Sequence, residues 1–154
     1  MVAEKNLLLL EAALNHSEDQ VMTPFFIVET SSQFDEACNN LKETVINHGY
    51  GLLAMHDLGA TLRQKHMSFS ENCCVFEICD PEQAAKMLAL DISVCMALPC
   101  RISVFTDNGE TKMGMLKLAD IVSDINGPSE LAEVIGDVES AVTALMLEAA
   151  SMNS

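Results

Sequence analysis

The sequence predicts a single domain that combines a β-sheet with helices, and three features of the chain predict it. Strand-like segments alternate with segments whose apolar residues recur at helical spacing, in the order strand, helix, strand, helix, strand, helix. An Asn-Gly turn then joins two further strand-like segments, and a long amphipathic segment follows. A chain of 154 residues, of which 49% are hydrophobic, is long enough to bury one core.

The first part of the chain predicts a leading helix, a strand and a longer helix. Residues 5–15 are rich in Leu, Glu and Ala, which favours a short helix. Residues 25–30 are the first strand candidate and are apolar on both faces over most of their length. At Ser32 the apolar spacing becomes helical, and we expect Ser32 and Asp35 to form a capping box. Gly49 ends this helix, since glycine readily takes the left-handed conformation.

Two strand and helix pairs come next. Residues 50–56 are the second strand candidate, and Asp57 is placed to cap a short helix after it. Residues 73–79, Cys-Cys-Val-Phe-Glu-Ile-Cys, are the third strand candidate. Asp80 and Pro81 are typical of a helix cap and a first helical turn. Proline lacks a backbone N–H, but at the first helical position this group has no acceptor within the helix. The third helix is therefore expected directly after the third strand.

The last two strand candidates are predicted to form a hairpin. Residues 100–106 and 111–118 have strand-like composition. Asn108 and Gly109 between them supply the positive backbone angles that a tight turn requires. The chain is therefore expected to turn back on itself here.

A long acidic amphipathic helix is predicted after Pro128, and its apolar repeat leaves two interpretations open. The helix packs on its own sheet, or it forms a coiled-coil seam between two chains. The pattern falls short of the roughly four clean heptads that a coiled coil needs, which favours the first interpretation. We divide the chain into an N-terminal helical extension (1–23), a core domain (24–122) and the C-terminal helix (123–154).

Composition and charge exclude several partner classes. A formal net charge of −15 repels nucleic acid and anionic membrane surfaces, so neither is expected as a partner. No apolar run approaches the ~18 residues of a membrane span, and the amino-terminal residues do not form a secretory signal. Six cysteines in a chain of this length are then expected to be reduced thiols, and we predict a cytoplasmic protein.

Five motifs in this order resemble the bacterial and archaeal family of domain of unknown function 302 over residues 25 to 120. They are Gly49-Tyr50-Gly51, Asp57, Glu77-x-Cys79-x-Pro81, Leu98-Pro99-Cys100-Arg101 and Val104-Phe105-Thr106-Asp107-Asn108-Gly109. The resemblance implies an α+β fold similar to that of the TATA-binding protein. It implies an antiparallel sheet of about five strands with helices packed on one face, and a homodimer. It implies no activity, because fold does not determine function.

Four residues around the third and fourth strands are the candidate site: Glu77, Cys79, Cys100 and Arg101. If the two strands are antiparallel neighbours, Cys79 and Cys100 lie at the same edge of the sheet. Strict alternation points these two thiols to opposite faces, and only a distortion near Pro99 would reunite them. The same alternation places Glu77 and Arg101 on one face, either as an ion pair or as the charged lining of a small-ligand pocket.

The leading functional hypothesis is a cytoplasmic, dimeric domain that binds a small ligand or regulates a partner, with the four candidate residues at its site. The alternative is a thiol-dependent protein for sulfur transfer, redox chemistry or soft-metal binding that uses Cys79 or Cys100. Arg101 favours the alternative if its charge lowers the pKa of the adjacent Cys100. A third hypothesis is an interaction protein whose working surface is the long helix after Pro128. The sequence does not decide whether the protein is an enzyme, and it assigns no catalytic residue, cofactor or substrate.

Metal-site patterns are absent from the sequence. There is no Cys-x-x-Cys, and the spacing of His48, His56 and His66 matches no zinc motif. Cys38 falls on the apolar stripe of its helix, where free cysteine usually packs as a small core residue. We therefore predict no metal site.

Overall fold

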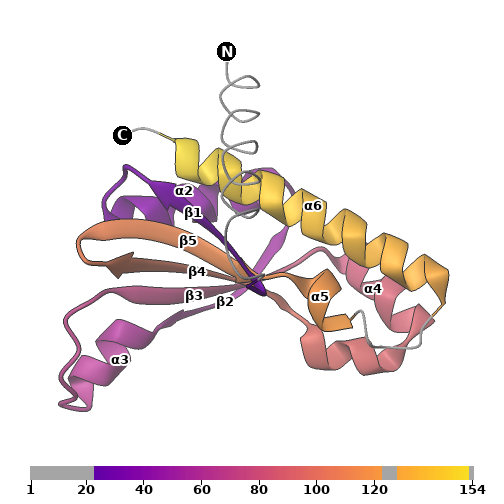
Figure 1. Cartoon of the computed structure of the whole chain (residues 1–154), viewed down its shortest axis with the longest axis horizontal. Helices are drawn as coiled ribbons and strands as arrows, with labels where there is room; N and C mark the ends of the chain where they lie inside the picture. The colour runs from indigo at the N-terminus through magenta and orange to yellow at the C-terminus, as the bar shows by residue number, and fades with distance from the viewer. Residues whose placement is uncertain (1–22, 123–127, 153–154) are drawn as a thin grey trace.

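The computed structural model describes residues 23–122 and 128–152, which form a five-stranded sheet with helices (Figure 1). The elements follow the predicted order of alternating strands and helices. They are β1 (Phe25–Thr30), α2 (Phe34–Asn47), β2 (Gly51–Asp57), α3 (Leu58–Gln64), β3 (Cys73–Cys79), α4 (Pro81–Leu90), η1 (Ile92–Ala97), β4 (Cys100–Asp107), β5 (Glu110–Leu116), α5 (Leu118–Val122) and α6 (Ser129–Ser151). The α+β class expected from the sequence is confirmed.

The sheet is antiparallel throughout, with the strand order β1-β5-β4-β3-β2. The β4–β5 hairpin lies at its centre, between β3 and β1. Asn108 and Gly109 have positive φ angles of 52° and 84°, as the predicted tight turn requires. The two edge strands are β1 and β2, and the latter carries a register shift between Leu52 and Ala54.

One face of the sheet is covered by α2 and α6 (Figure 1). The core is formed by alternate strand residues and the inner stripes of these helices. Phe76, Ile102 and Met113, from three neighbouring strands, are completely buried. From the helices, Leu41, Val45, Ile135, Val142 and Leu145 are no more than 2% exposed. The apolar face of α6 is therefore used within the chain, as the first of the two interpretations predicts.

The start of α2 differs from its predicted capping box. Gln33 occupies the cap position and makes no side-chain cap hydrogen bond. The Ser32 hydroxyl instead donates to the backbone carbonyl of Met152, at 3.1 Å, and is buried beneath the end of α6. At the other end of α2, His48 Nε2 lies 2.6 Å from the Glu148 carboxylate. Both contacts join α2 to α6, so the serine serves helix packing rather than helix initiation.

Other predicted ends are confirmed or corrected. The Asp57 carboxylate accepts from the Ala60 backbone N–H at 2.8 Å and caps α3, and Asp80 accepts from the Glu82 N–H at 3.1 Å at the start of α4. The last strand is shorter than predicted, because Leu118 already begins α5. The predicted leading helix, residues 5–15, lies outside the described residues.

Within the described ranges, no helix has the length and apolar character needed to cross a membrane.

We predict that Leu145→Ala lowers the free energy of unfolding by about 2–5 kcal/mol, because it opens a cavity beneath a side chain that is 1% exposed. Chemical denaturation monitored by circular dichroism measures this change. Glu133→Ala, on the exposed side of the same helix, is the control and should shift the stability by about 0.5 kcal/mol or less. Equal effects of the two variants would contradict the packing of α6 described above.

Candidate functional site

Among the described residues, no helix covers the centre of the sheet face opposite α2 and α6, and this centre is apolar. We call the following residues the open face: Phe25, Ile27, Cys73, Val75, Arg101, Ser103, Phe105, Gly114 and Leu116. Phe25, Ile27 and Leu116, which lie on the paired strands β1 and β5, are 52%, 48% and 52% exposed. In an antiparallel sheet with one buried face, the other face is usually polar. The exposed apolar side chains of the open face are therefore unusual.

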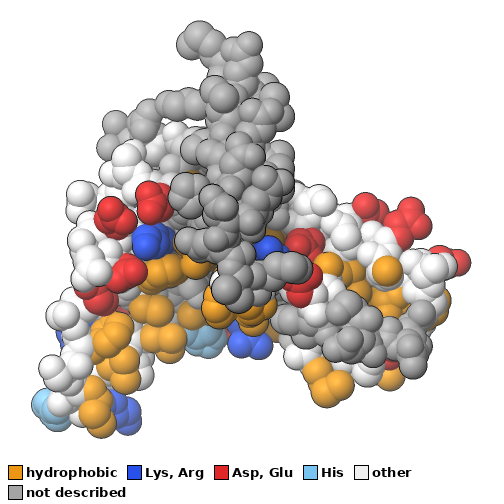
Figure 2. Space-filling model, in the orientation of Figure 1, with side chains coloured by type: hydrophobic (Ala, Val, Ile, Leu, Met, Phe, Trp, Pro, Cys, Tyr) orange, Lys and Arg blue, Asp and Glu red, His pale blue; other side chains and the backbone are white. Residues whose placement is uncertain are grey.

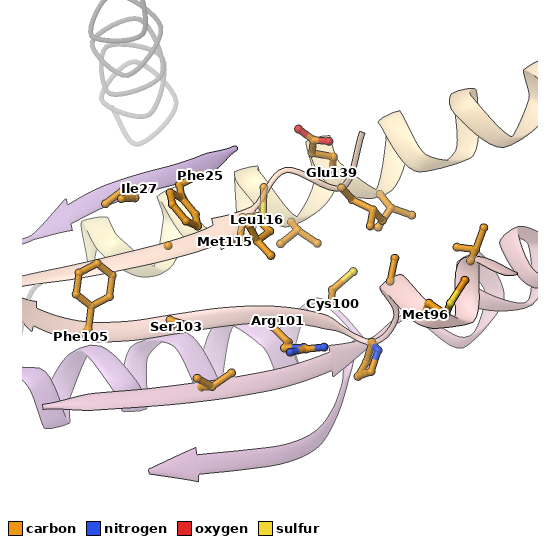
Figure 3. A pocket seen from close by; sticks show the side chains of 18 of the residues that line it. Phe25, Ile27, Met96, Cys100, Arg101, Ser103, Phe105, Met115, Leu116 and Glu139 are labelled. Carbon is orange, nitrogen blue, oxygen red and sulfur yellow. The ribbon is translucent and has the colours of Figure 1, made fainter. Parts of the chain in front are cut away.

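A cavity of about 750 Å³ lies over the open face and continues past the ends of the strands to η1 and α6. We call this cavity the hollow. Figure 2 shows the outline of the molecule hollowed between the sheet and the lobe of α4, η1 and α5. In Figure 3, Met96 and Glu139 lie across the opening from Phe25 and Phe105. Its volume falls within the range of roughly 300–1,000 Å³ that is usual for small-molecule sites.

The strand register explains why this face is hollowed. One row across four strands consists of Ile27, Gly114, Ser103 and Val75, so the two smallest side chains occupy its centre. A Cβ atom at Gly114 would lie 3.4 Å from Ile27 Cγ1 and 3.6 Å from Phe105 Cε1. Those are ordinary contact distances, so the glycine is not required by crowding. Its missing side chain lowers the floor of the hollow between larger neighbours.

Two charged residues are among the described residues that line the hollow, Arg101 and Glu139. The Glu139 carboxylate accepts a hydrogen bond of 2.9 Å from the Ala119 backbone N–H at the start of α5. Arg101 is exposed, and within the described part of the chain no carboxylate lies within 4.0 Å of its guanidinium. The hollow therefore has apolar walls and a cation that no described acidic group neutralises directly.

The expected register of Glu77 and Arg101 is confirmed, but the two side chains do not form an ion pair. The two residues are directly opposite each other in the β3–β4 register, on the same face. However, the Glu77 carboxylate lies 3.5 Å from His56 Nε2 on β2, and Glu77 does not line the hollow. The expected ion pair is therefore absent among the described residues, because β2 supplies a competing partner.

Cys79 and Cys100 lie at the same end of the neighbouring strands β3 and β4, as expected, since Ile78 and Cys100 are register partners. Both line a second, much smaller cavity of about 20 Å³ beside Tyr50 and Pro99. Burial, and then the charge of Cys79, raise the pKa of Cys100 from 9.0 to about 11. The proposed lowering of this pKa by Arg101 is therefore wrong, because alternation along β4 directs Arg101 to the opposite face of the sheet.

The comparisons with known proteins identify the family. The family model described as domain of unknown function DUF302 matches residues 26–149. The chain belongs to the DUF302 family. A crystal structure of an uncharacterised conserved DUF302 protein from Bacillus stearothermophilus is similar, with a TM-score of 0.77 and 29% sequence identity over 84% of this chain and 99% of that one. No curated protein matches.

The DUF302 match extends the resemblance read from the sequence. That resemblance covers residues 25 to 120, whereas the match continues to residue 149 and so includes α6. The helix that covers one sheet face is therefore part of the family's domain in this chain.

The remaining thiols of this DUF302 chain lie in α2, β3 and η1. All six cysteines are free, and the described residues contain no cluster of three or more potential metal-ligating side chains. Burial, and then the neighbouring Cys74 thiol, raise the pKa of Cys38 to about 12. Cys95 lies in η1 and is exposed.

Sequence reasoning missed most of the residues that line the hollow. It identified Arg101 and Cys100 but not Phe25, Ile27 or Gly114. The available signal was the apolar character of β1 on both faces, which is unusual for an edge strand with one solvated side. Without the sheet order, that signal did not show which strands lie beside β1.

We predict that Cys95 is the thiol of native DUF302 protein that iodoacetamide modifies first near pH 8. Raising the pKa of Cys100 from 9.0 to about 11 lowers its thiolate fraction by about a hundredfold, and the effect on Cys38 is larger. Peptide mapping by mass spectrometry measures the order of labelling, and denatured protein is the control in which all six react. Modification of Cys100 as fast as Cys95 in folded protein would contradict this assignment.

Proposed function

We propose that this DUF302 domain binds a small molecule and that the hollow holds it. The observation that carries the proposal is a cavity of about 750 Å³ whose floor is lowered at Gly114, in the middle of a sheet. Small-molecule sites are concave and mostly apolar, with a few polar groups that orient the ligand. The hollow has this composition, with Arg101 and Ser103 as polar groups on its sheet side.

The exposed apolar side chains supply a driving force for binding. Phe25, Ile27 and Leu116 are each about half exposed. Fully burying a side chain of this size contributes about 1.5–3 kcal/mol, so each retains a substantial part of that stabilisation for a bound molecule. A ligand that covers them removes apolar surface from water without requiring the sheet to rearrange.

The thiol-dependent alternative receives less support. A reactive thiol needs a lowered pKa and access to solvent, whereas burial raises the pKa of Cys100. We therefore make small-molecule binding, rather than sulfur transfer, redox chemistry or soft-metal binding, the proposed function. Glu77 and Cys79 lie beside the hollow rather than in it, and they enter this proposal only through their effects on neighbouring groups.

The homodimer and the cytoplasmic location are also part of the proposal. A second apolar surface, separate from the hollow, lies along edge strand β2 and α3, where Leu53, Met55, Leu58 and Leu62 are 36–60% exposed. An exposed apolar edge strand favours association with another chain, and a second copy is the partner that we propose. Six free cysteines are suited to a reducing compartment.

We predict that Gly114→Val lowers the affinity for Nile red, a neutral apolar dye, by about tenfold or more, because the new side chain fills the floor of the hollow. A fluorescence titration of the full chain measures the affinity, and circular dichroism checks the fold. Glu29→Val introduces the same side chain on the same face of β1, outside the lining of the hollow, and should leave the affinity unchanged. No saturable binding by the wild-type protein, or equal binding by Gly114→Val, would reject the proposed function.

A further inference from the structure

We propose that the ligand of the hollow is an apolar monoanion, a carboxylic acid with a hydrocarbon or aromatic body, whose carboxylate binds Arg101. This inference rests on the proposed function and adds the chemical class of the ligand. It follows from the position of Arg101, from the state of the neighbouring charged groups and from the charge of the whole protein.

Arg101 is the cation of the hollow. Among the described lining residues the other charged group is Glu139, one carboxylate oxygen of which accepts a hydrogen bond from the Ala119 N–H. The guanidinium has no carboxylate within 4.0 Å in the described ranges, in a protein that carries eight Lys and Arg against 23 Asp and Glu. In so acidic a chain, an arginine at the rim of an apolar cavity with no described acidic side chain as its partner favours an anion as the bound species.

The geometry around Arg101 suits a carboxylate. Guanidinium binds a carboxylate through two parallel hydrogen bonds, and it is weakly hydrated, so it tolerates an apolar surrounding better than an ammonium group does. Ser103 lies two residues further along β4 on the same face, and its hydroxyl makes no hydrogen bond in the described part of the chain. This hydroxyl is a second donor for the same anion. In Figure 3, Arg101 and Ser103 follow each other along the strand beneath the opening.

The rest of the hollow favours an apolar group in the part of the ligand that lies away from Arg101. From the Arg101 end, its floor continues past Ser103 and over Gly114 between Ile27 and Phe105, and beyond Ser103 this path offers apolar contacts. A hydrocarbon chain or a ring lying there would cover Phe25 and Leu116, which are half exposed.

The overall charge favours a ligand with a single negative charge over more highly charged ones. A net charge of −15 repels anions at long range, and the repulsion grows with each charge that the ligand carries. Polyphosphates and dicarboxylates meet a larger penalty with one guanidinium to offset it. Glu77, opposite Arg101 in the sheet, adds to this penalty, although His56 draws its carboxylate away.

The test compares octanoic acid with octan-1-ol, which have the same chain length and differ in charge, by isothermal titration calorimetry on the full chain. The wild-type protein should prefer the acid by about tenfold or more, the size of effect expected for a charge-assisted hydrogen-bonded pair. Arg101→Gln should abolish the preference by weakening the acid alone, and Arg101→Lys should keep part of it. Equal affinity for acid and alcohol, or a preference that survives in Arg101→Gln, would overturn the inference.

Two further variants separate a direct contact from a general effect of charge. Lys86→Gln also removes one positive charge, from an exposed position on α4 outside the hollow, and should leave the preference intact. Glu77→Gln removes the acidic neighbour of Arg101 and should strengthen acid binding by about threefold without changing the affinity for the alcohol. Equal losses in Lys86→Gln and Arg101→Gln would overturn the inference, because the whole field of the protein would then account for the effect.

The outcomes distinguish this inference from the proposed function. If Gly114→Val still blocks Nile red while acid and alcohol bind equally, the hollow is a binding site for neutral apolar molecules and the inference is wrong. If neither the dye nor the acid binds, both are wrong. Sedimentation velocity identifies a further outcome, in which a second copy covers the open face and the acid binds only as the dimer dissociates, and this result would also overturn the inference.

Discussion

The packing of α2 and α6 on a single face of the sheet is the constraint on which the rest of this structure depends. Side chains alternate along each strand, so burying one face commits every second residue to the core and directs the others to the opposite face. On that opposite face the chain places Phe25, Ile27 and Leu116 rather than charged residues, and Gly114 at the centre. Burying one face of the sheet thus leaves a second face outside the core. The hollow arises from the particular side chains on that second face.

Electrostatics then distinguishes the two functional hypotheses for these strands, small-molecule binding and thiol-dependent chemistry. Cys100 and Arg101 are adjacent in sequence and both line the hollow, but alternation along β4 points their side chains in opposite directions and their environments differ. Burial raises the pKa of the Cys100 thiol, which lines both the hollow and the smaller cavity, whereas Arg101 lies at the edge of the hollow with its charge unpaired by any described side chain. The apolar cavity with its cation is suited to binding, and the buried thiol is suited to packing.

The sequence predicts local features well and distant partners poorly. The Asp57 carboxylate caps the backbone only three residues away, and Asn108-Gly109 form the turn with their own backbone, so both roles follow from a few residues of sequence. Ser32 bonds instead to Met152, 120 residues away, which no capping rule anticipates. The register of Glu77 and Arg101 was predictable from alternation, but the competing contact with His56 depends on a shifted register in β2. The hollow was not predictable, because it requires knowing that β1 lies beside β5. The roles of Glu77, Cys79, Cys100 and Arg101 in a site stay predictions.

The most direct test of the central claim, that the open face binds a small molecule, is methyl NMR of the full chain labelled at Ile, Leu and Val and titrated with octanoic acid. The account predicts saturable shifts of the Ile27, Leu116 and Val75 methyl groups, which line the hollow, while Leu53 and Leu62 on the β2–α3 surface stay unchanged. Shifts confined to Leu53 and Leu62, or no shifts, would contradict it and would leave the open face without a ligand.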